Sequence, residues 1–208
     1  MKQIALVLFL GFVLSLCNLS ERLHKGSSGS NSSGSSSVSD NASSPERAQP
    51  TAAQTAALAG GKEANWDRQS MSFTVPPNWT ESQQESKTLT WRSPGDGAAS
   101  LIVSISPLGE EFPVDASIQA FFDDAKTRAK NGEVDELKWV EIDGLKGVQF
   151  RESNPEEGDD HRRLQWMAYR KYTGQVQLVN VMLASEGKDF ERHKDAMYGI
   201  LYSLKITH

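Results

Sequence analysis

The sequence predicts an α/β protein: an α/β/α sandwich in which an antiparallel sheet of about six or seven strands has helices on both faces. Short segments with alternating apolar residues are joined by tight turns, which favours antiparallel strands. Two longer segments carry apolar residues at helical spacing. The late strands are apolar on both sides, and two apolar faces require two covering layers.

Three strands are expected first, followed by a helix. The strands are MSFTVP, SKTLTWRSP and ASLIVSISP, at residues 71–76, 86–94 and 99–107. Prolines end the first strand because they lack the N–H that a strand ladder needs. The helical stripe that follows consists of Ile118, Phe121, Phe122, Ala125 and Ala129. Asp115 or Ser117 is expected to cap this helix, and Gly132 lies just beyond its end.

Four further strands and a closing helix are expected. The strands are ELKWVEID, KGVQFRES, LQWMAYRKY and QVQLVNVMLAS, at residues 136–143, 146–153, 164–172 and 175–185. In the third of them Leu164, Trp166 and Ala168 point one way, and Met167 and Tyr169 point the other. The closing helix is expected from about Asp189 to Ser203. Its core residues are Phe190, Met197, Ile200 and Leu201, with Leu204 just beyond.

Residues 1–63 have the composition of a targeting segment and a linker. Residues 1–17 carry a positive start and an apolar run of 13 residues, Ile4 to Leu16, which predicts a signal peptide or an N-terminal anchor. Residues 18–63 are rich in Ser, Gly and Ala and predict a disordered tether. The short helical potential at Ala52 to Leu58 has no expected partner face. The globular domain is therefore expected at residues 64–208.

Cys17 is a lipidation candidate. It follows Leu14 and Ser15 as in a bacterial lipobox, but Leu16 stands where a small residue is required. Cleavage after Cys17 and an uncleaved anchor are the alternatives. We expect an extracytoplasmic protein that is secreted or anchored in the cell envelope, with the N-terminus as its contact with the membrane.

Composition excludes several classes of function. The net charge is −5 and the pI is about 5.4, so the basic surface of a nucleic-acid-binding protein is absent. Cys17 is the one cysteine, which excludes an internal disulfide, a cysteine-based zinc site and a cysteine nucleophile in the folded part. The motifs of serine hydrolases and dinucleotide-binding loops are missing as well. We therefore assign no catalytic residue and no cofactor.

Three segments are distinctive: FTVPPNW (73–79), EIDGLKGVQF (141–150) and FERHKDAMYGILYSLKI (190–206). They resemble the entry, the central hairpin and the last helix of the PsbP-like domain superfamily, and the resemblance covers residues 66–206. The superfamily also includes a Ran-binding yeast nuclear import factor and bacterial envelope lipoproteins. The resemblance implies the same sandwich and a non-catalytic role in supporting a partner's assembly or stability.

Trp79, directly after the double proline, is expected to fold back over the sheet edge and cover the core. Stacking on a ligand is the alternative role for this ring.

The loop at residues 152–163 contains the candidate metal ligands, Glu156, Glu157, Asp159 and Asp160. Hard cations such as Ca²⁺ prefer such oxygen clusters, and photosynthetic members of the superfamily are associated with calcium and manganese. The spacing is not that of an EF-hand, and an acidic hairpin tip that is merely solvated is the competing interpretation.

Three functions remain open at this point. The first is a membrane-tethered interaction or assembly-support module that binds an envelope protein. The second is a small-ligand or lipid carrier, whose pocket Trp139, Trp166 and Tyr169 would line if they are not ordinary core residues. The third is a hydrolase in which His161 acts with a carboxylate of the acidic loop as a general base.

Overall fold

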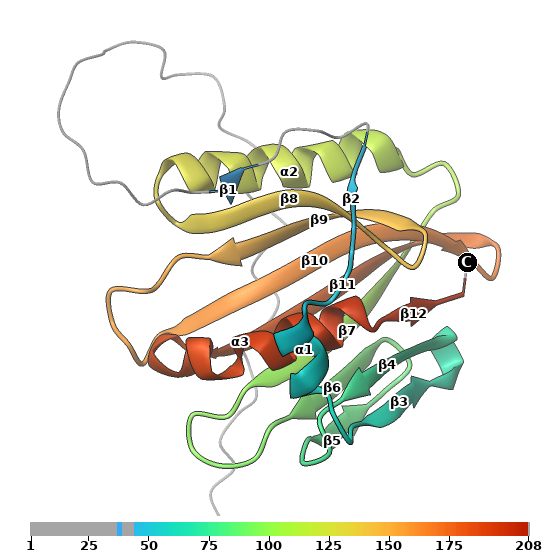
Figure 1. The fold of residues 1–208 in the computed structure, drawn as a ribbon. Coiled ribbons are helices and arrows are strands. Elements are labelled where there is room, and N and C mark those ends of the chain that lie inside the picture. Colours follow the sequence, from blue (N-terminus) through green and yellow to red (C-terminus); the bar gives the residue numbers. More distant parts are fainter. Residues whose placement is uncertain (1–36, 39–43, 208) are drawn as a thin grey trace, which may run out of the picture. The chain divides into compact units, whose positions relative to one another are not determined.

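Seven antiparallel strands form most of the large sheet in this computed structural model, which describes residues 37–38 and 44–207 (Figure 1). Across the sheet they are β5 (Thr80–Gln84), β6 (Thr88–Arg92), β7 (Ser100–Leu108), β11 (Gln175–Glu186), β10 (His161–Tyr172), β9 (Leu145–Glu152) and β8 (Val134–Ile142). The two-residue strands β1 (Ser37–Val38) and β2 (Glu46–Arg47) pair in parallel with β8. The described residues belong to one unit of the chain, residues 34–208.

Two tight hairpins set the register of the late strands. β8 and β9 are joined by Asp143 and Gly144, and β10 and β11 by Thr173 and Gly174. All four turn residues have positive φ angles, between 48° and 85°. Two-residue loops of this kind match the twist of antiparallel strands. They place Val140 opposite Gly147 and so align β8 with β9 beside the candidate site described below.

A second sheet of three strands was not expected. It contains β3 (Lys62–Trp66), β4 (Met71–Val75) and β12 (Lys205–Ile206), with the short 3₁₀ helix Asp67–Gln69 between β3 and β4. We expected residues 71–76 to open the large sheet, and this is wrong. The double proline ends β4, and the polar strand β5 takes the edge position beside β6.

Trp79 is buried, as predicted, with 2% of its surface exposed. Its backbone N–H donates to the carbonyl of Pro76, which closes the turn after β4. The ring belongs to the larger hydrophobic cluster, together with Trp66 and Phe73 of the small sheet. The ligand-stacking alternative therefore has no support from its position.

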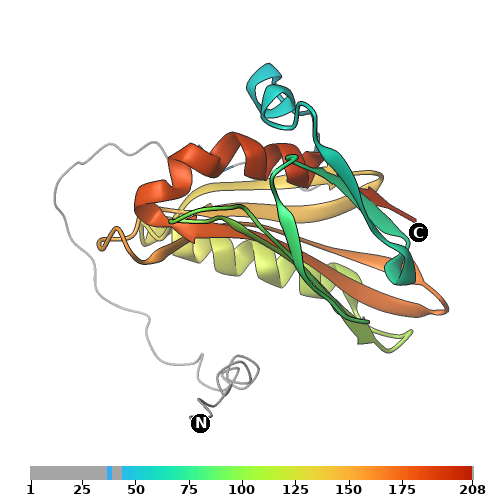
Figure 2. The same cartoon turned by 90° about the horizontal axis from the view of Figure 1, so that it is seen from below.

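The two long helices pack with different hydrophobic clusters. α2 (Val114–Lys130) places Phe122 against Trp139 and shares its cluster with Met167 and Tyr169. α3 (Gly187–Tyr202) shares the other cluster with Leu164, Trp166 and Ala168. The strands of the large sheet lie between α2 and α3 in Figure 2. The predicted alternation along β10 is confirmed, and the fold class is a mixed α/β domain.

Both helix predictions are confirmed in position, but the expected cap of α2 is not. Pro113 occupies the N-cap position, and no side chain caps the helix. Ser117 instead shares a hydrogen bond of 2.7 Å with the Tyr169 hydroxyl. Gly132 lies beyond the helix end with a φ of 82°, as the sequence predicted.

Residues 44–63 of the predicted tether form regular structure, which corrects their assignment as disordered. They contain β2, the helix α1 (Ala52–Ala57) and the start of β3, and β1 also lies within the predicted tether. Thr51 and Gln54 form a reciprocal capping box at the start of α1. The partner face that the sequence did not reveal is α3, where Gly199 lies against Leu58.

Within residues 44–207, no helix has both the length and the apolar character to cross a bilayer. Cys17, the apolar run of residues 4–16 and residues 18–36 lie outside the described residues.

Candidate functional site

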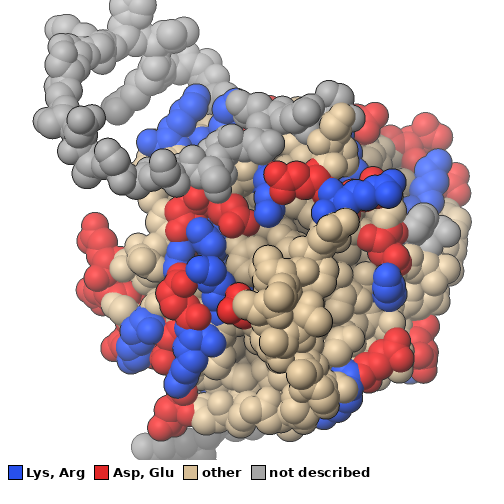
Figure 3. Space-filling view, in the orientation of Figure 1, with Lys and Arg blue, Asp and Glu red and all other residues tan. Residues whose placement is uncertain are grey.

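A cleft of about 280 Å³ opens at the β8 edge of the large sheet. Lys138 and Arg151 line it from the sheet, Lys194 and Tyr198 from α3, and Glu46 from β2. Charged side chains of both signs gather on this face beside an uncharged area over α1, whose sequence AAQTAA carries no charge (Figure 3). The cleft thus lies where charged side chains border an uncharged area of this face.

Three polar side chains of the large sheet form its floor, Glu136 and Lys138 of β8 and Arg151 of β9. Arg151 lies opposite Glu136, and the buried Gln149 of β9 lies opposite Lys138. The Gln149 amide donates to Glu136 Oε1 over 2.7 Å, although Gln149 is fully buried. Among the described residues, no donor reaches the Gln149 Oε1 atom. The hydrogen bond from Gln149 to Glu136 joins β9 to β8 across the floor.

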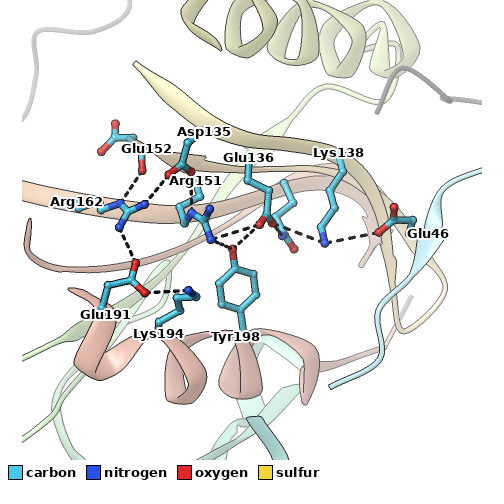
Figure 4. Close-up of polar contacts among 11 residues, drawn as sticks. Glu46, Asp135, Glu136, Lys138, Arg151, Glu152, Arg162, Glu191, Lys194 and Tyr198 are labelled. Atoms are coloured by element: carbon cyan, nitrogen blue, oxygen red, sulfur yellow. Dashed lines mark hydrogen bonds and ion pairs between the residues drawn. The ribbon is translucent and has the colours of Figure 1, made fainter. Parts of the chain in front are cut away.

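Tyr198 connects the floor to α3 (Figure 4). Its hydroxyl donates to Glu136 Oε2 over 2.9 Å and accepts from the Arg151 guanidinium over 3.3 Å. Burial raises the pKa of Tyr198, and the neighbouring Glu136 raises it further. The phenol therefore stays protonated and acts as a fixed hydrogen-bond donor.

Lys138 stands between two carboxylates. Its Nζ lies 3.6 Å from Glu46 and 3.6 Å from Glu136. Burial lowers the pKa of Lys138, but Tyr202, Glu136 and Glu46 outweigh it and leave the pKa above its ordinary value. The cleft thus keeps a permanent positive charge that the chain's own Glu46 partly neutralises.

A β-bulge builds the neighbouring ion-pair network. The register of β8 shifts between Val134 and Glu136, so that Asp135 and Glu136 both reach Arg151. Asp135 Oδ1 accepts from Arg151 Nε over 2.7 Å. The pKa of Arg151 is raised above its ordinary value, because Asp135, Tyr198 and Glu136 outweigh the effect of burial. The consecutive residues Asp135 and Glu136 therefore both pair with Arg151.

Arg162 is the buried centre of this network, with 2% of its surface exposed. Its guanidinium donates to the carbonyl of Glu152 over 2.7 Å, to Asp135 over 2.6 Å and to Glu191 over 2.9 Å. It also lies over the ring of Phe190, 4.4 Å from the centroid. These contacts tie β8, β9 and β10 to α3 (Figure 4).

Glu152, the last residue of β9, joins the network and links it to Arg128 of α2. Its carboxylate accepts from Arg163 and from Arg128, the latter over 2.8 Å. Burial raises the pKa of Glu152, but the two arginines lower it more, so the net pKa is below its ordinary value. The carboxylate is ionised at neutral pH and paired on both oxygens.

The candidate metal ligands do not form a site. Glu156, Glu157, Asp159 and Asp160 are all exposed, and Asp159 pairs with Lys188. Among the residues that the structure describes, no group of three or more His, Cys, Asp or Glu side chains could hold a metal ion.

His161 opens β10 as an exposed residue. No carboxylate and hydroxyl converge on it within the described part of the chain. The arrangement that the hydrolase hypothesis requires is therefore not found there.

The three aromatic residues proposed for a carrier pocket do not meet. Trp139 and Tyr169 belong to the α2 cluster, whereas Trp166 belongs to the α3 cluster. Trp139 and Trp166 are at most 2% exposed. The alternative interpretation as core residues is confirmed for Trp139 and Trp166, whereas Tyr169 is partly buried.

Sequence reasoning missed the charged cleft. A signal was present: Glu136 and Lys138 share one face of their strand with the buried apolar residues Val140 and Ile142. Without the register of β8 and β9, nothing in the sequence shows that these side chains meet each other, or that Glu46 and Tyr198 lie above them.

Comparison with known proteins reveals similarity of fold alone. No family model matches the chain, and no curated protein matches its sequence. Among solved structures, LpqN of Mycobacterium tuberculosis is 14% identical, with a TM-score of 0.53 over 71% of this chain and 86% of LpqN. Cyanobacterial PsbP from Synechocystis is 12% identical, with a TM-score of 0.44 over 71% of this chain and 92% of PsbP.

The similarity to LpqN is one of fold, and a fold shared with envelope proteins is what the sequence resemblance implied. At these identities, the similarity carries no site residue and no ligand over to this chain.

Proposed function

We propose that this chain is a non-catalytic interaction module of the cell envelope, extracytoplasmic and held at a membrane by its N-terminal segment. The observation that carries the proposal is the charged cleft at the β8 edge. There, strand backbone, fixed cations and fixed carboxylates are presented together at the surface of a rigid sheet. Such a surface recognises a protein segment through main-chain pairing and charge complementarity.

The chemistry of the cleft favours binding over catalysis. The carboxylates of Glu136 and Asp135 are paired with cations, and the pKa values of Tyr198 and Tyr202 are raised by burial. The two tyrosines therefore stay protonated at neutral pH, which suits recognition better than proton transfer.

Two further points support the envelope part of the proposal. LpqN, a solved structure with a similar fold, is described as involved in cell envelope biogenesis. The apolar run before Cys17 has the length of a signal-peptide core.

We also infer that α2 and α3 enclose the large sheet as a three-layer sandwich, since alternate residues of β10 face the two clusters.

In-cell photo-crosslinking tests the interaction. Gln49 is exposed on the rim of the cleft, and Glu156 is exposed in the acidic loop. A photoreactive amino acid at position 49 should give a discrete protein adduct in intact cells, and the same group at position 156 should give far less. Equal labelling from both positions, or none from position 49, would contradict the proposal.

The membrane attachment has its own test. Cells producing the wild type and Cys17→Ser are fractionated, and the mass of the mature N-terminus is measured. A diacylated Cys17 that disappears in the variant supports lipidation, and full-length membrane protein in both supports an uncleaved anchor. A soluble wild type that begins at Asn18 would contradict the attachment.

A further inference from the structure

Residues 44–60 lie over the charged cleft and are here called the strap. β2 of the strap pairs with Val140 and Glu141 on the outer edge of β8. The N–H of Ala48 donates to the carbonyl of Glu141 over 2.9 Å, which extends the pairing by one bond. The strap then continues through Pro50 into α1, which packs on α3.

The contacts of the strap with β8 are few and exposed. Glu46 lies 3.6 Å from Lys138, and Arg47 lies 3.4 Å from Glu141. The side chains of Glu46 and Arg47 are 60% and 81% exposed. Ion pairs of this exposure contribute little to stability, and a two-residue strand adds few ladder bonds. This part of the strap is therefore weakly held.

The firmer anchor of the strap is α1. Leu58, at the C-cap of α1, packs against the larger core cluster and does not line the cleft. A side chain at Gly199 would collide with this helix, because its Cβ would lie 2.8 Å from the carbonyl of Gln54 and 3.1 Å from Leu58. The strap is thus retained by a hydrophobic contact that is separate from the charged cleft.

The strap leaves the cleft incompletely filled. About 280 Å³ remains between its small residues, such as Ala48 and Thr51, and the floor formed by β8 and β9. β8 has nine residues, and the described strands β1 and β2 pair with four of them. A longer segment with larger side chains would use more of this edge than the strap does.

We propose that the β8 edge and the cleft are the docking site for an extended segment of the protein partner, and that the strap occupies this site in cis. The partner segment runs parallel to β8, with an acidic residue at the position of Glu46 facing Lys138 and a basic residue at the position of Arg47 facing Glu141. Binding requires displacement of the strap, so the free protein is autoinhibited. This inference rests on the proposed function and specifies its partner.

The test separates the strap from its site without altering the site. Leu58→Asp in the otherwise intact chain removes the hydrophobic anchor, and Ala59→Asp, at a neighbouring exposed position, is the matched control. The probe is a fluorescein-labelled peptide with the sequence of residues 44–60, followed by fluorescence anisotropy. Because a tethered segment competes at a high effective concentration, wild type and Ala59→Asp should bind it at least tenfold more weakly than Leu58→Asp.

Charge reversal in the peptide checks the mode of binding. A peptide carrying Glu46→Arg and Arg47→Glu should bind Leu58→Asp at least fivefold more weakly. Folded Leu58→Asp that does not bind the peptide would overturn the proposal, as would equal binding by all three chains or by both peptides. If the strap proposal is overturned in this way, labelling from position 49 in cells would still support the proposed function. The partner would then bind without displacing the strap.

Hydrogen exchange in the wild type gives a test that does not depend on a folded variant. The Ala48 amide should exchange at least a hundredfold faster than amides paired between β10 and β11, because the strap opens locally. Exchange of the Ala48 amide at the same slow rate as that ladder would show a strap that does not open, and would overturn the proposal.

Discussion

Replacing Arg162 with methionine tests whether the ion-pair network stabilises the fold at the end of the sheet. The side chain is 3% exposed, so methionine retains much of the apolar stem against Phe190 and removes the guanidinium. The carbonyl of Glu152 then loses its donor, which costs about 1–3 kcal/mol for a buried acceptor. Asp135 and Glu191 each keep another cation and are 32% and 61% exposed, so neither becomes an isolated buried charge.

Arg162→Met is therefore expected to lower the free energy of unfolding by about 2–4 kcal/mol. Removing one partner of a fully buried ion pair costs roughly 3–5 kcal/mol, and the cost here is lower because Asp135 and Glu191 keep other cations. Urea unfolding followed by tryptophan fluorescence measures it, with an unchanged m-value as the sign of an intact two-state transition. Arg163→Met is the matched control. Arg163 is 45% exposed and Glu152 keeps Arg128, so a loss within about 1 kcal/mol is expected. Equal losses in the two variants would refute the reasoning.

Four further outcomes are expected. Trp79→Ala should lower the free energy of unfolding by about 3–5 kcal/mol in the same urea assay, and a loss below about 1 kcal/mol would place the ring outside the core. The depressed pKa of Glu152 gives stability that is present above its ordinary pKa and lost as the pH falls through the folded value. Wild type should therefore lose more stability than Glu152→Gln between about pH 5 and pH 3, and parallel curves would contradict this. Serine at all four carboxylates of residues 156–160 should change stability by less than about 0.5 kcal/mol, and millimolar Ca²⁺ should not raise the melting temperature of either protein. A chain that starts at Gly61 should be about 1–2 kcal/mol less stable than one that starts at Ser44, because the contacts of Leu58 with the core are lost; equal stability would show that α1 adds nothing.

The sequence was sufficient wherever a residue pattern reflects burial. Alternation along residues 164–169 predicted which side chains of β10 face each cluster, and the helical stripe from Ile118 to Ala129 predicted the buried face of α2. Both patterns arise because a strand or helix exposes one set of positions to an apolar neighbour.

Elements without such a pattern were missed. β5 has five exposed residues, TESQQ, and is held by backbone bonds that carry no side-chain signature. The Ala-rich helix α1 has no buried residue of its own and depends on Gly199, which is far along the chain. A contact of that kind becomes visible only when the tertiary arrangement is known.

The candidate site could not be predicted from the sequence for the same reason, because its contacts depend on the tertiary arrangement. Exposed carboxylates at residues 156–160 drew attention because they are adjacent in sequence, yet the structure leaves them in solvent. The cleft combines Glu46, Lys138, Arg151 and Tyr198 from four separate elements. Its assembly depends on the β8–β9 register, the bulge at Asp135 and the position of α3.

The most direct test of the account is crosslinking from inside the cleft with the strap retained and released. Lys194 lines the cleft from α3 and is 37% exposed, so a photoreactive amino acid at this position reports occupation of the site. Adducts are compared in intact cells between the otherwise wild-type chain and the same chain carrying Leu58→Asp. We predict a discrete partner adduct that increases severalfold when the strap is released. An adduct that is absent from both chains, or that decreases on release, would contradict the account.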